Sequence, residues 1–196
     1  MSSTGLLILS NVNNIKSSLV AAQKYVKNLY IHINIPKTSE ISSLPSPAWR
    51  HLVNRIYADC FRASPNIDVR VLANPLKNCE NSLIQKEIQM LFSDINYPEI
   101  CERFKNLYKI NGQAIILNDS SETYFGNFRK DDSKMFGTVV VGGTFDRIHT
   151  GHKILLTEAI LRARNKLIVG VTSNEMVKSK FLNIKLKRNL IQMSVC

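Results

Sequence analysis

Two histidines, three residues apart, follow a glycine-rich turn in the second half of the chain. Residues 138–152 read Thr-Val-Val-Val-Gly-Gly-Thr-Phe-Asp-Arg-Ile-His-Thr-Gly-His. Gly142 and Gly143 allow a tight turn and a close approach of the backbone to a ligand. His149 and His152 can both project from the first turn of a helix toward one anion. Together, these residue types and their spacing predict a phosphate-binding site.

The segments around this motif suit the same chemistry. A buried-strand pattern precedes the turn, and a helical run (153–164) and a second strand pattern (166–172) follow it. We expect Thr150 to cap the helix, which leaves free backbone N–H groups near Gly151 and His152. Such a helix start attracts phosphate through its free donors and through the helix dipole.

Each part of the motif also has a simpler explanation. Two adjacent glycines are usually just a turn, and a histidine pair at this spacing is more often incidental than functional. A histidine pair can also bind a metal, but no nearby carboxylate or cysteine completes such a site. The full combination, placed between a strand and a helix, is specific enough to favour the functional interpretation.

Strand-like and helix-like segments alternate along the rest of the chain, which predicts an α/β fold with a parallel sheet and covering helices. The clearest helix has one wide apolar face that runs from Trp49 to Phe61, with Ser46 as its cap and Pro47 at its first position. The expected strands are 5–10, 29–35, 68–73 and 114–117, the other expected helices are 15–28 and 97–110, residues 36–47 are expected to be a loop, and 82–92 fit either a helix or a strand.

A polar, charge-rich stretch divides the chain into two regions. We interpret residues 1–118 as an N-terminal α/β region and residues 119–137 as a linker. Residues 138–196 then form a second α/β unit, the first half of a Rossmann-like domain with a parallel sheet. A sheet that is only half built would expose apolar strand edges.

The composition is globular but basic. Apolar residues make up 44% and charged residues 21% of the chain, and the net charge is +11. A basic balance favours anionic partners such as nucleotides or phosphorylated metabolites. Aromatic residues do not alternate with the basic ones toward the C-terminal end, so we expect no nucleic-acid partner. No apolar stretch is long enough for a transmembrane segment.

The beginning of the chain carries no targeting pattern. No basic residue precedes the apolar run at 5–9, and the first arginine is Arg50, which argues against a signal peptide and a transit peptide. We expect a cytoplasmic protein and keep an association with mitochondria as an alternative. The cysteines have no metal-ligand spacing and are expected to be free thiols in a reducing compartment; they are Cys60, Cys79, Cys101 and Cys196.

The motif resembles the signature of the nucleotidyltransferase superfamily, which includes phosphopantetheine adenylyltransferases, lipid-headgroup cytidylyltransferases and class I aminoacyl-tRNA synthetases. The matching residues are Gly143-Thr-Phe-Asp146 and His149-x-Gly151-His152. The longer string is most similar to phosphopantetheine adenylyltransferases of eukaryotic and archaeal type. Strand candidates at the front of the chain resemble the N-terminal region of the animal bifunctional coenzyme A synthases, so the resemblance covers about residues 4–182.

The resemblance implies adenylyl transfer from ATP to 4′-phosphopantetheine, which gives dephospho-coenzyme A and pyrophosphate. It implies that His152 contacts the α-phosphate, that His149 binds ATP phosphates and that Thr144 orients the acceptor phosphate. Phe145 would contribute a backbone N–H group. Asp146 is interpreted as a structural acceptor that fixes the loop.

The remaining implied ligands are a cation and a metal. Lys180 is the expected clamp on the substrate phosphates, with Lys178 as the alternative. Mg²⁺ is expected on the nucleotide, without a protein ligand. The expected phosphate-binding set is completed by Gly142, Gly143 and Gly151.

The chain also departs from the family. Residues 183–196 do not resemble the family continuation, a later Ser-Ser/Thr motif has no match, and no P-loop is present, so the dephospho-coenzyme A kinase cannot reside here. We expect a truncated domain, from an alternative transcript, a fragment or a gene-model error, with little turnover. Two alternatives stay open: a catalytically incomplete interaction or regulatory module, and a lipid-headgroup cytidylyltransferase. Arg147 and the double glycine favour adenylyl transfer.

Overall fold

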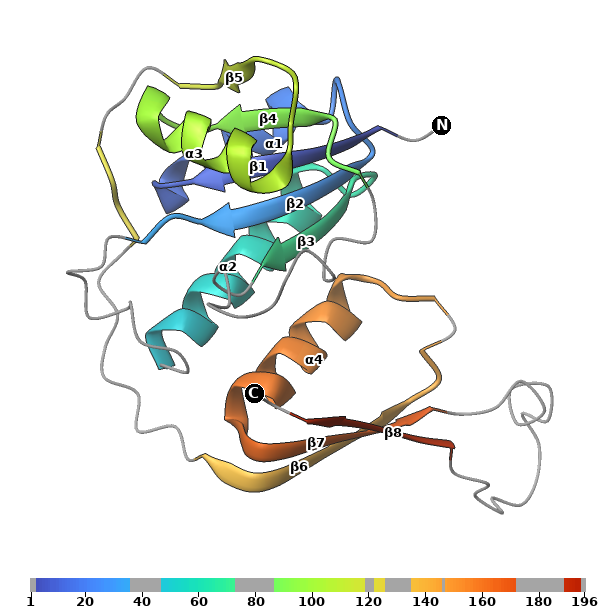
Figure 1. Cartoon of the computed structure of the whole chain (residues 1–196). Coiled ribbons are helices and arrows are strands. Elements are labelled where there is room, and N and C mark those ends of the chain that lie inside the picture. Colours follow the sequence, from blue (N-terminus) through green and yellow to red (C-terminus); the bar gives the residue numbers. More distant parts are fainter. Residues whose placement is uncertain are drawn as a thin grey trace. The chain divides into compact units, whose positions relative to one another are not determined.

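The chain forms two compact units, which are described separately (Figure 1). One unit is Met1–Ser42 with Arg55–Phe128, and the other is Ser43–Asn54 with Arg129–Cys196. The computed structural model describes residues 3–35, 47–72, 87–118, 122–125, 135–145, 147–171 and 189–194.

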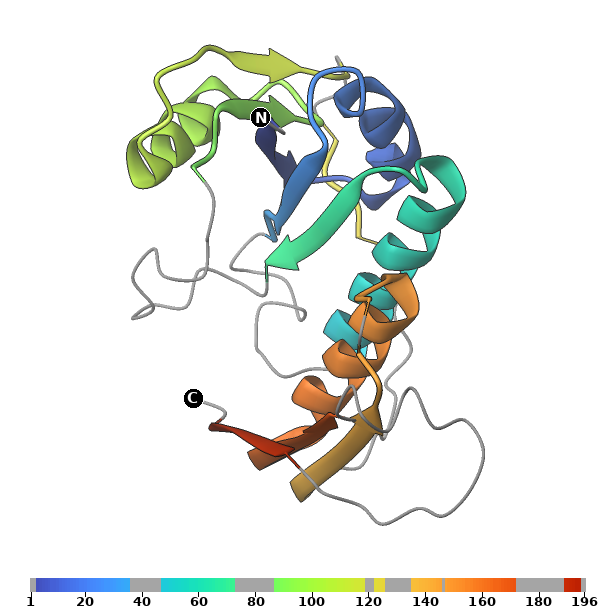
Figure 2. The same cartoon turned by 90° about the vertical axis from the view of Figure 1, so that its right-hand side faces the viewer.

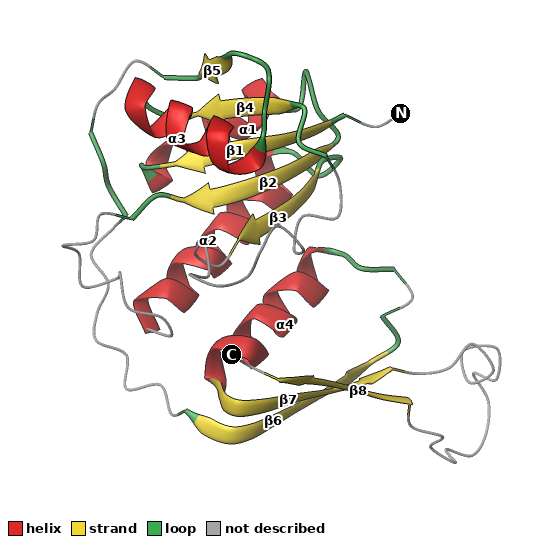
Figure 3. Cartoon of the chain, viewed as in Figure 1, coloured by secondary structure: helices red, strands yellow, loops and turns green. Residues whose placement is uncertain are grey.

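The first unit contains a five-stranded sheet in which all neighbouring strands are parallel (Figure 3). The strand order is β3-β2-β1-β4-β5. The alternation of strands and helices therefore predicted the fold class correctly. The elements are β1 (Thr4–Leu9), η1 (Val12–Asn14), α1 (Ile15–Ala22), β2 (Asn28–Ile33), α2 (Pro47–Ala63), β3 (Asp68–Leu72), β4 (Met90–Ser93), α3 (Pro98–Tyr108) and β5 (Ala114–Ile116).

Helices cover both faces of this sheet. Figure 2 shows α3 on one side, and α1 with the part of α2 from Arg55 onward on the other. The residues of β1 alternate between the two faces, and every one of them is buried. A strand buried on both faces is expected to have a continuous apolar run, and Leu6–Leu9 is such a run.

Helix α2 confirms the expected helix and corrects its apolar face. Phe61 is 63% exposed. It directly follows Cys60, which is buried, so its side chain points about 100° away around the helix axis. The expected cap Ser46 and the expected loop before it lie outside the described residues. The buried members of the predicted face are Trp49, Leu52, Val53, Ile56, Tyr57 and Cys60.

Most of the other expected elements agree with the structure to within a few residues, but the expected helix 15–28 is too long, because α1 ends at Ala22 and Asn28 already begins β2. Helix α3 begins with Pro98 and ends at Tyr108, and its C-cap Lys109 has a left-handed φ of 53°. Of the ambiguous residues 82–92, those from Met90 onward form β4, and 82–86 lie outside the description. Cys60 and Cys101 carry thiols outside any disulfide, as expected, and both are buried, whereas Cys79 and Cys196 are not described.

Part of the expected linker is attached to the first unit. Tyr124 forms a parallel β-bridge with Asn11. The Val12 N–H donates to the Tyr124 carbonyl at 2.7 Å, and the Tyr124 N–H donates to the Ser10 carbonyl at 3.1 Å. Residues 122–125 thus cross the carboxyl end of β1, which a polar composition alone did not indicate.

The second unit has the expected strand–helix–strand order. Strands β6 (Phe136–Gly143) and β7 (Ala163–Val171) are parallel neighbours, joined by α4 (Thr150–Arg162). A third strand, β8 (Asn189–Ser194), pairs with β7 in the antiparallel direction, so the sheet is mixed instead of wholly parallel. β7 is the only partner of β6 among the described residues, and Val140 of β6 is 67% exposed.

None of the helices in the described ranges is long and apolar enough to cross a membrane.

Candidate functional site

Strand β6 delivers the glycine-rich turn to the start of α4. Val139 and Val141 pack with the small core under α4, and the strand ends at Gly142 and Gly143. A Cβ atom on Gly143 would lie 3.0 Å from Cε2 of Phe145, tighter than ordinary packing, whereas one on Gly142 would meet nothing closer than 4.0 Å. Only the second glycine is therefore required by a close approach.

Phe145 has an unusual backbone conformation in this turn. Its φ is 46°, in the left-handed region that a bulky side chain rarely adopts. Such a conformation costs about 1–3 kcal/mol and persists only where surrounding contacts enforce it. The Phe145 ring lies over Gly143 on one side, and its centroid is 4.8 Å from that of His152. The strained residue thus packs against one of the two motif histidines.

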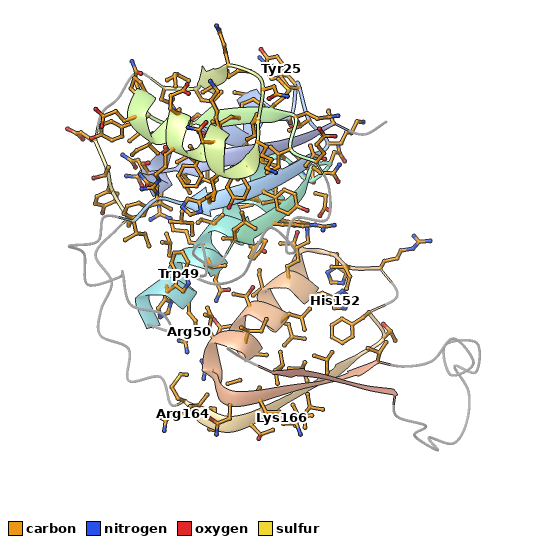
Figure 4. All side chains as sticks on the ribbon, viewed as in Figure 1. Tyr25, Trp49, Arg50, His152, Arg164 and Lys166 are labelled. Carbon is orange, nitrogen blue, oxygen red and sulfur yellow. The ribbon has the colours of Figure 1, made fainter. Side chains whose placement is uncertain are left out.

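The two histidine rings lie side by side at the start of α4. Their centroids are 3.9 Å apart, with an angle of 31° between the ring planes. His149 is exposed and His152 is half-buried; Figure 4 shows His152 at the beginning of the helix. The expectation that both rings face the same side is met by this arrangement, and their reach to one phosphate stays a prediction.

His149, and not Thr150, caps helix α4. The His149 Nδ1 accepts a hydrogen bond from the Gly151 N–H at 3.1 Å, and Thr150 is the first helical residue. The imidazole reaches this donor because His149 has an extended backbone, with φ −121° and ψ 176°. The Gly151 N–H is consequently already satisfied, so the expectation that it is free for an anion is wrong.

The hydrogen bonds define what each ring can offer a ligand. Because His149 Nδ1 accepts, the proton of its neutral ring is on Nε2, which is a donor. His152 Nδ1 lies 3.1 Å from the Arg147 carbonyl oxygen, which can only accept, so this Nδ1 carries a proton. Nε2 of His152 then accepts in the neutral ring and donates when the ring is protonated. An anion oxygen can therefore accept a hydrogen bond from Nε2 of His149 in either protonation state of that ring, and from Nε2 of His152 only when that ring is protonated.

The remaining predicted site residues divide into two groups. Thr144 is exposed in the turn and Gly151 is exposed at the helix start, so both are placed near the histidines by the chain itself. Asp146, Lys178 and Lys180 lie outside the described residues. Their expected roles therefore stay predictions.

Two features of the site were missed by the sequence analysis. The first is the Arg147 carbonyl as the partner of His152, because a backbone acceptor leaves no trace in residue types. The second is the Phe145 ring, which was considered only for its backbone N–H. The neighbouring glycine was a usable signal, since a glycine two residues from an aromatic residue can make room for its ring.

One known family has a model that matches the second unit. The cytidylyltransferase-like family model matches residues 140–192. That segment carries the turn, the histidine pair and α4. The match extends ten residues beyond the resemblance that ended near 182, so part of the tail, 183–192, is family-like after all.

Several curated proteins similar to this chain are phosphopantetheine adenylyltransferases. The one from Pyrococcus horikoshii is 55% identical over 47 residues, which are 24% of this chain and 29% of that protein. The one from Saccharomyces cerevisiae is 43% identical over 49 residues, 25% of this chain and 16% of that protein. A bifunctional phosphopantetheine adenylyltransferase/NTP phosphatase from Thermoplasma volcanium is 54% identical over 39 residues, 20% and 12% of the two chains.

The chain thus spans less than a third of the length of the curated relatives it matches. No solved structure matches it.

Proposed function

We propose that the second unit carries part of an adenylyltransferase site, which transfers the AMP group of ATP to the phosphate of 4′-phosphopantetheine. The observation that carries this proposal is the pair of adjacent rings, His149 and His152, at the start of α4 and directly after the Gly142-Gly143 turn. Several curated proteins that are similar to part of this chain are named phosphopantetheine adenylyltransferases, which supports the choice of substrates.

The reaction needs no nucleophilic side chain. An oxygen of the 4′-phosphate forms a bond to the α-phosphorus of ATP, and the bond from that phosphorus to the oxygen that bridges to the β-phosphorus breaks. Pyrophosphate leaves with the bonding electrons. The attacking phosphate is already ionised, so catalysis consists of positioning and of stabilising the charge at the α-phosphate.

The residues of the turn have distinct roles in this proposal. The Nε2 proton of His149 donates to an ATP phosphate oxygen, and His152 in its protonated form donates to an α-phosphate oxygen. Thr144 orients the acceptor phosphate, and the Phe145 backbone N–H lines the same pocket. Lys180, or Lys178 in its place, supplies the cation on the far side of the phosphates.

Mg²⁺ would be carried by the triphosphate. Within the described ranges, no group of three His, Cys, Asp or Glu side chains could hold a metal ion. Mg²⁺ prefers carboxylate, phosphate and water oxygens, and two imidazoles suit it poorly. The metal would neutralise charge on the leaving pyrophosphate, while the imidazoles act on the phosphate oxygens directly.

The deciding assay measures pyrophosphate release from ATP and 4′-phosphopantetheine. We expect little or no release by the 196-residue chain and clear release by a version extended to the length of its relatives, since several donors act together in such sites. A silent extended version refutes the proposed activity. Equal rates for both versions show that the 196 residues already contain the whole site.

A matched pair of variants separates the two roles of His149. In the extended version, His149→Asn keeps a side-chain oxygen for the Gly151 N–H, and asparagine is a good helix cap. It removes only the Nε2 donor, so we expect a rate loss of about 10²-fold with unchanged stability. His149→Ala loses the rate and also about 1 kcal/mol of stability. A wild-type rate in His149→Asn would reduce His149 to a cap.

Two alternatives are decided by the same preparation. A lipid-headgroup cytidylyltransferase would release pyrophosphate from CTP with phosphocholine or glycerol phosphate; the cytidylyltransferase-like family match is compatible with this alternative. An interaction or regulatory module would release none with any substrate pair in either version. The double glycine at 142–143 and Arg147 favour ATP.

We further propose that the chain is related to the animal bifunctional coenzyme A synthases. The support is the resemblance of β1, β2 and β3 to the N-terminal region of those enzymes.

The origin of the tail, residues 183–196, can be tested by mass spectrometry of peptides from the source cells. Peptides that span residues 180–196 would show that this polypeptide is made. Peptides that continue differently after Asn183 would point to a gene-model error.

A further inference from the structure

In the first unit, the topological switch point of the parallel sheet lies between the carboxyl ends of β1 and β4. The chain proceeds from β1 to β2 on one side, and β4 pairs with the other side of β1. In open α/β sheets, ligands occupy the crevice at such a switch point, beyond the ends of the strands. The first unit has this topology but lacks a glycine-rich turn after β1, where Ser10 and Asn11 follow.

A carboxylate of the chain itself occupies the backbone donors at this position. Asp94, directly after β4, is fully buried. Its Oδ1 accepts from the Ser10 N–H at 2.8 Å and its Oδ2 accepts from the Asn11 N–H at 2.7 Å. Both bonds are short and charge-assisted, and they turn two successive backbone N–H groups toward one anion, so a phosphate in place of the carboxylate would find the same two donors.

The same place is closed from outside by residues 122–125. Besides the two backbone bonds of Tyr124 with Val12 and Ser10, the Asn11 side-chain amide donates to the Glu122 carbonyl at 3.1 Å. Phe125 is buried at the end of this segment. The crevice beyond β1 is thus filled by an acidic side chain and covered by a strap, both from the same chain.

We propose that Asp94 is a built-in anion that takes the place of a ligand phosphate and keeps the switch point of the first unit closed to nucleotides. The first unit then has a nucleotide-binding topology without nucleotide binding. The two units differ accordingly: in the second unit the His149 imidazole accepts from one N–H group, that of Gly151 in the first turn of α4, and in the first unit a carboxylate accepts from two N–H groups directly after β1. A phosphate can compete with an imidazole, but a carboxylate also repels it.

The test follows the backbone amide signals of Ser10 and Asn11 by NMR in the ¹⁵N-labelled 196-residue chain during titration with inorganic phosphate near pH 7.5. Burial raises the pKa of Asp94 to about 6, so its carboxylate is ionised there. In the wild-type chain we expect neither signal to move. In Asp94→Gly, which removes the carboxylate and leaves space, we expect both to move in a saturable way, with affinity at least about tenfold above wild type.

Two further variants keep the outcome decisive. Asp59→Asn, at a buried aspartate of the same unit that pairs with Lys16 and Arg55, is the matched control and should not create a phosphate response at Ser10 and Asn11. Asp94→Ser replaces Asp94→Gly if the glycine variant does not fold.

Movement of the Ser10 and Asn11 signals in the wild-type chain would refute the proposal. A folded Asp94→Gly or Asp94→Ser protein without a response would do so too, because Asp94 would then only fix the loop. If neither variant folds, the wild-type titration still decides between an open and a closed crevice. Signals near His149 report on the proposed activity separately.

Discussion

His32 and Asp94 are expected to give the first unit two opposite pH dependences that nearly cancel. Burial lowers the pKa of His32 to about 4 from 6.5, with a smaller contribution from the charge of Arg103. Burial also raises the pKa of Asp94 to about 6 from 3.8, and the N–H donors of Ser10 and Asn11 only partly oppose this. Both groups therefore resist charge in the folded state.

The signs follow from which state binds the proton. Between pH 6.5 and 4 the unfolded chain protonates His32 and the folded chain does not, so stability falls as the pH falls. Between pH 3.8 and 6 the folded chain keeps a proton on Asp94 and the unfolded chain does not, so stability falls as the pH rises. Each shift of roughly two units corresponds to about 3 kcal/mol, with opposite slopes in the same window.

Single substitutions should reveal the two opposite pH dependences of the free energy of unfolding, which nearly cancel in the wild-type chain. His32→Leu removes a buried ring whose Nδ1 has no hydrogen-bond partner, and it leaves the Asp94 slope alone. Relative to wild type, its stability should improve by about 3 kcal/mol from pH 6.5 down to pH 4. Asp94→Asn should show the reverse: relative to wild type, its free energy of unfolding should fall by about 3 kcal/mol from pH 6.5 down to pH 4. Ile31→Val, on the same strand, should cost about 0.5–1.5 kcal/mol at every pH.

The assay is urea unfolding at pH 4, 5, 6 and 7, followed by the amide signals of β1, which report on the first unit alone. Differences from wild type at each pH cancel the contributions of all other carboxylates. A pH-independent difference for His32→Leu would mean that His32 is not held neutral in the folded chain, and the reasoning from its burial would fail.

Two glycines provide further tests by close packing. Gly143→Ala places a methyl group 3.0 Å from the Phe145 ring and should weaken ATP binding by the extended chain about tenfold, whereas Gly137→Ala, on the same strand and with nothing closer than 3.9 Å, should bind ATP like wild type, and calorimetric titration compares the two. Gly5→Ala places a methyl group 2.7 Å from Phe92 Cε2 in the core and should lower the free energy of unfolding of the first unit by about 1–3 kcal/mol; an unchanged urea midpoint would show that the ring can move aside.

Elements were predictable from the sequence where one local pattern dominates. The apolar run of β1 and the periodic face of α2 are signals of this kind. Strand β8 is different, because its antiparallel pairing with β7 depends on a long-range contact and not on its own residues. The burial of Phe61 was predicted wrongly because this residue lies at the edge of the apolar face of α2. There, a step of one residue around the helix separates a buried side chain from an exposed one.

The site shows the same division. The spacing of His149 and His152 predicted neighbouring rings, because three residues make nearly one helical turn. It could not show that an imidazole would outcompete Thr150 as the cap, since this depends on the extended backbone of His149. The hydrogen bonds that Asp94 accepts from Ser10 and Asn11 join residues more than eighty positions apart, and no local sequence pattern indicates them.

The left-handed conformation of Phe145 offers a record of past selection. Glycine or asparagine would adopt this backbone at lower cost, by about 1 kcal/mol. Either replacement would relieve this backbone cost but would also remove the contacts of the ring with Gly143, with His152 and with the small core under α4. A lineage that keeps the aromatic residue is therefore one in which these ring contacts outweigh the cost of the backbone conformation.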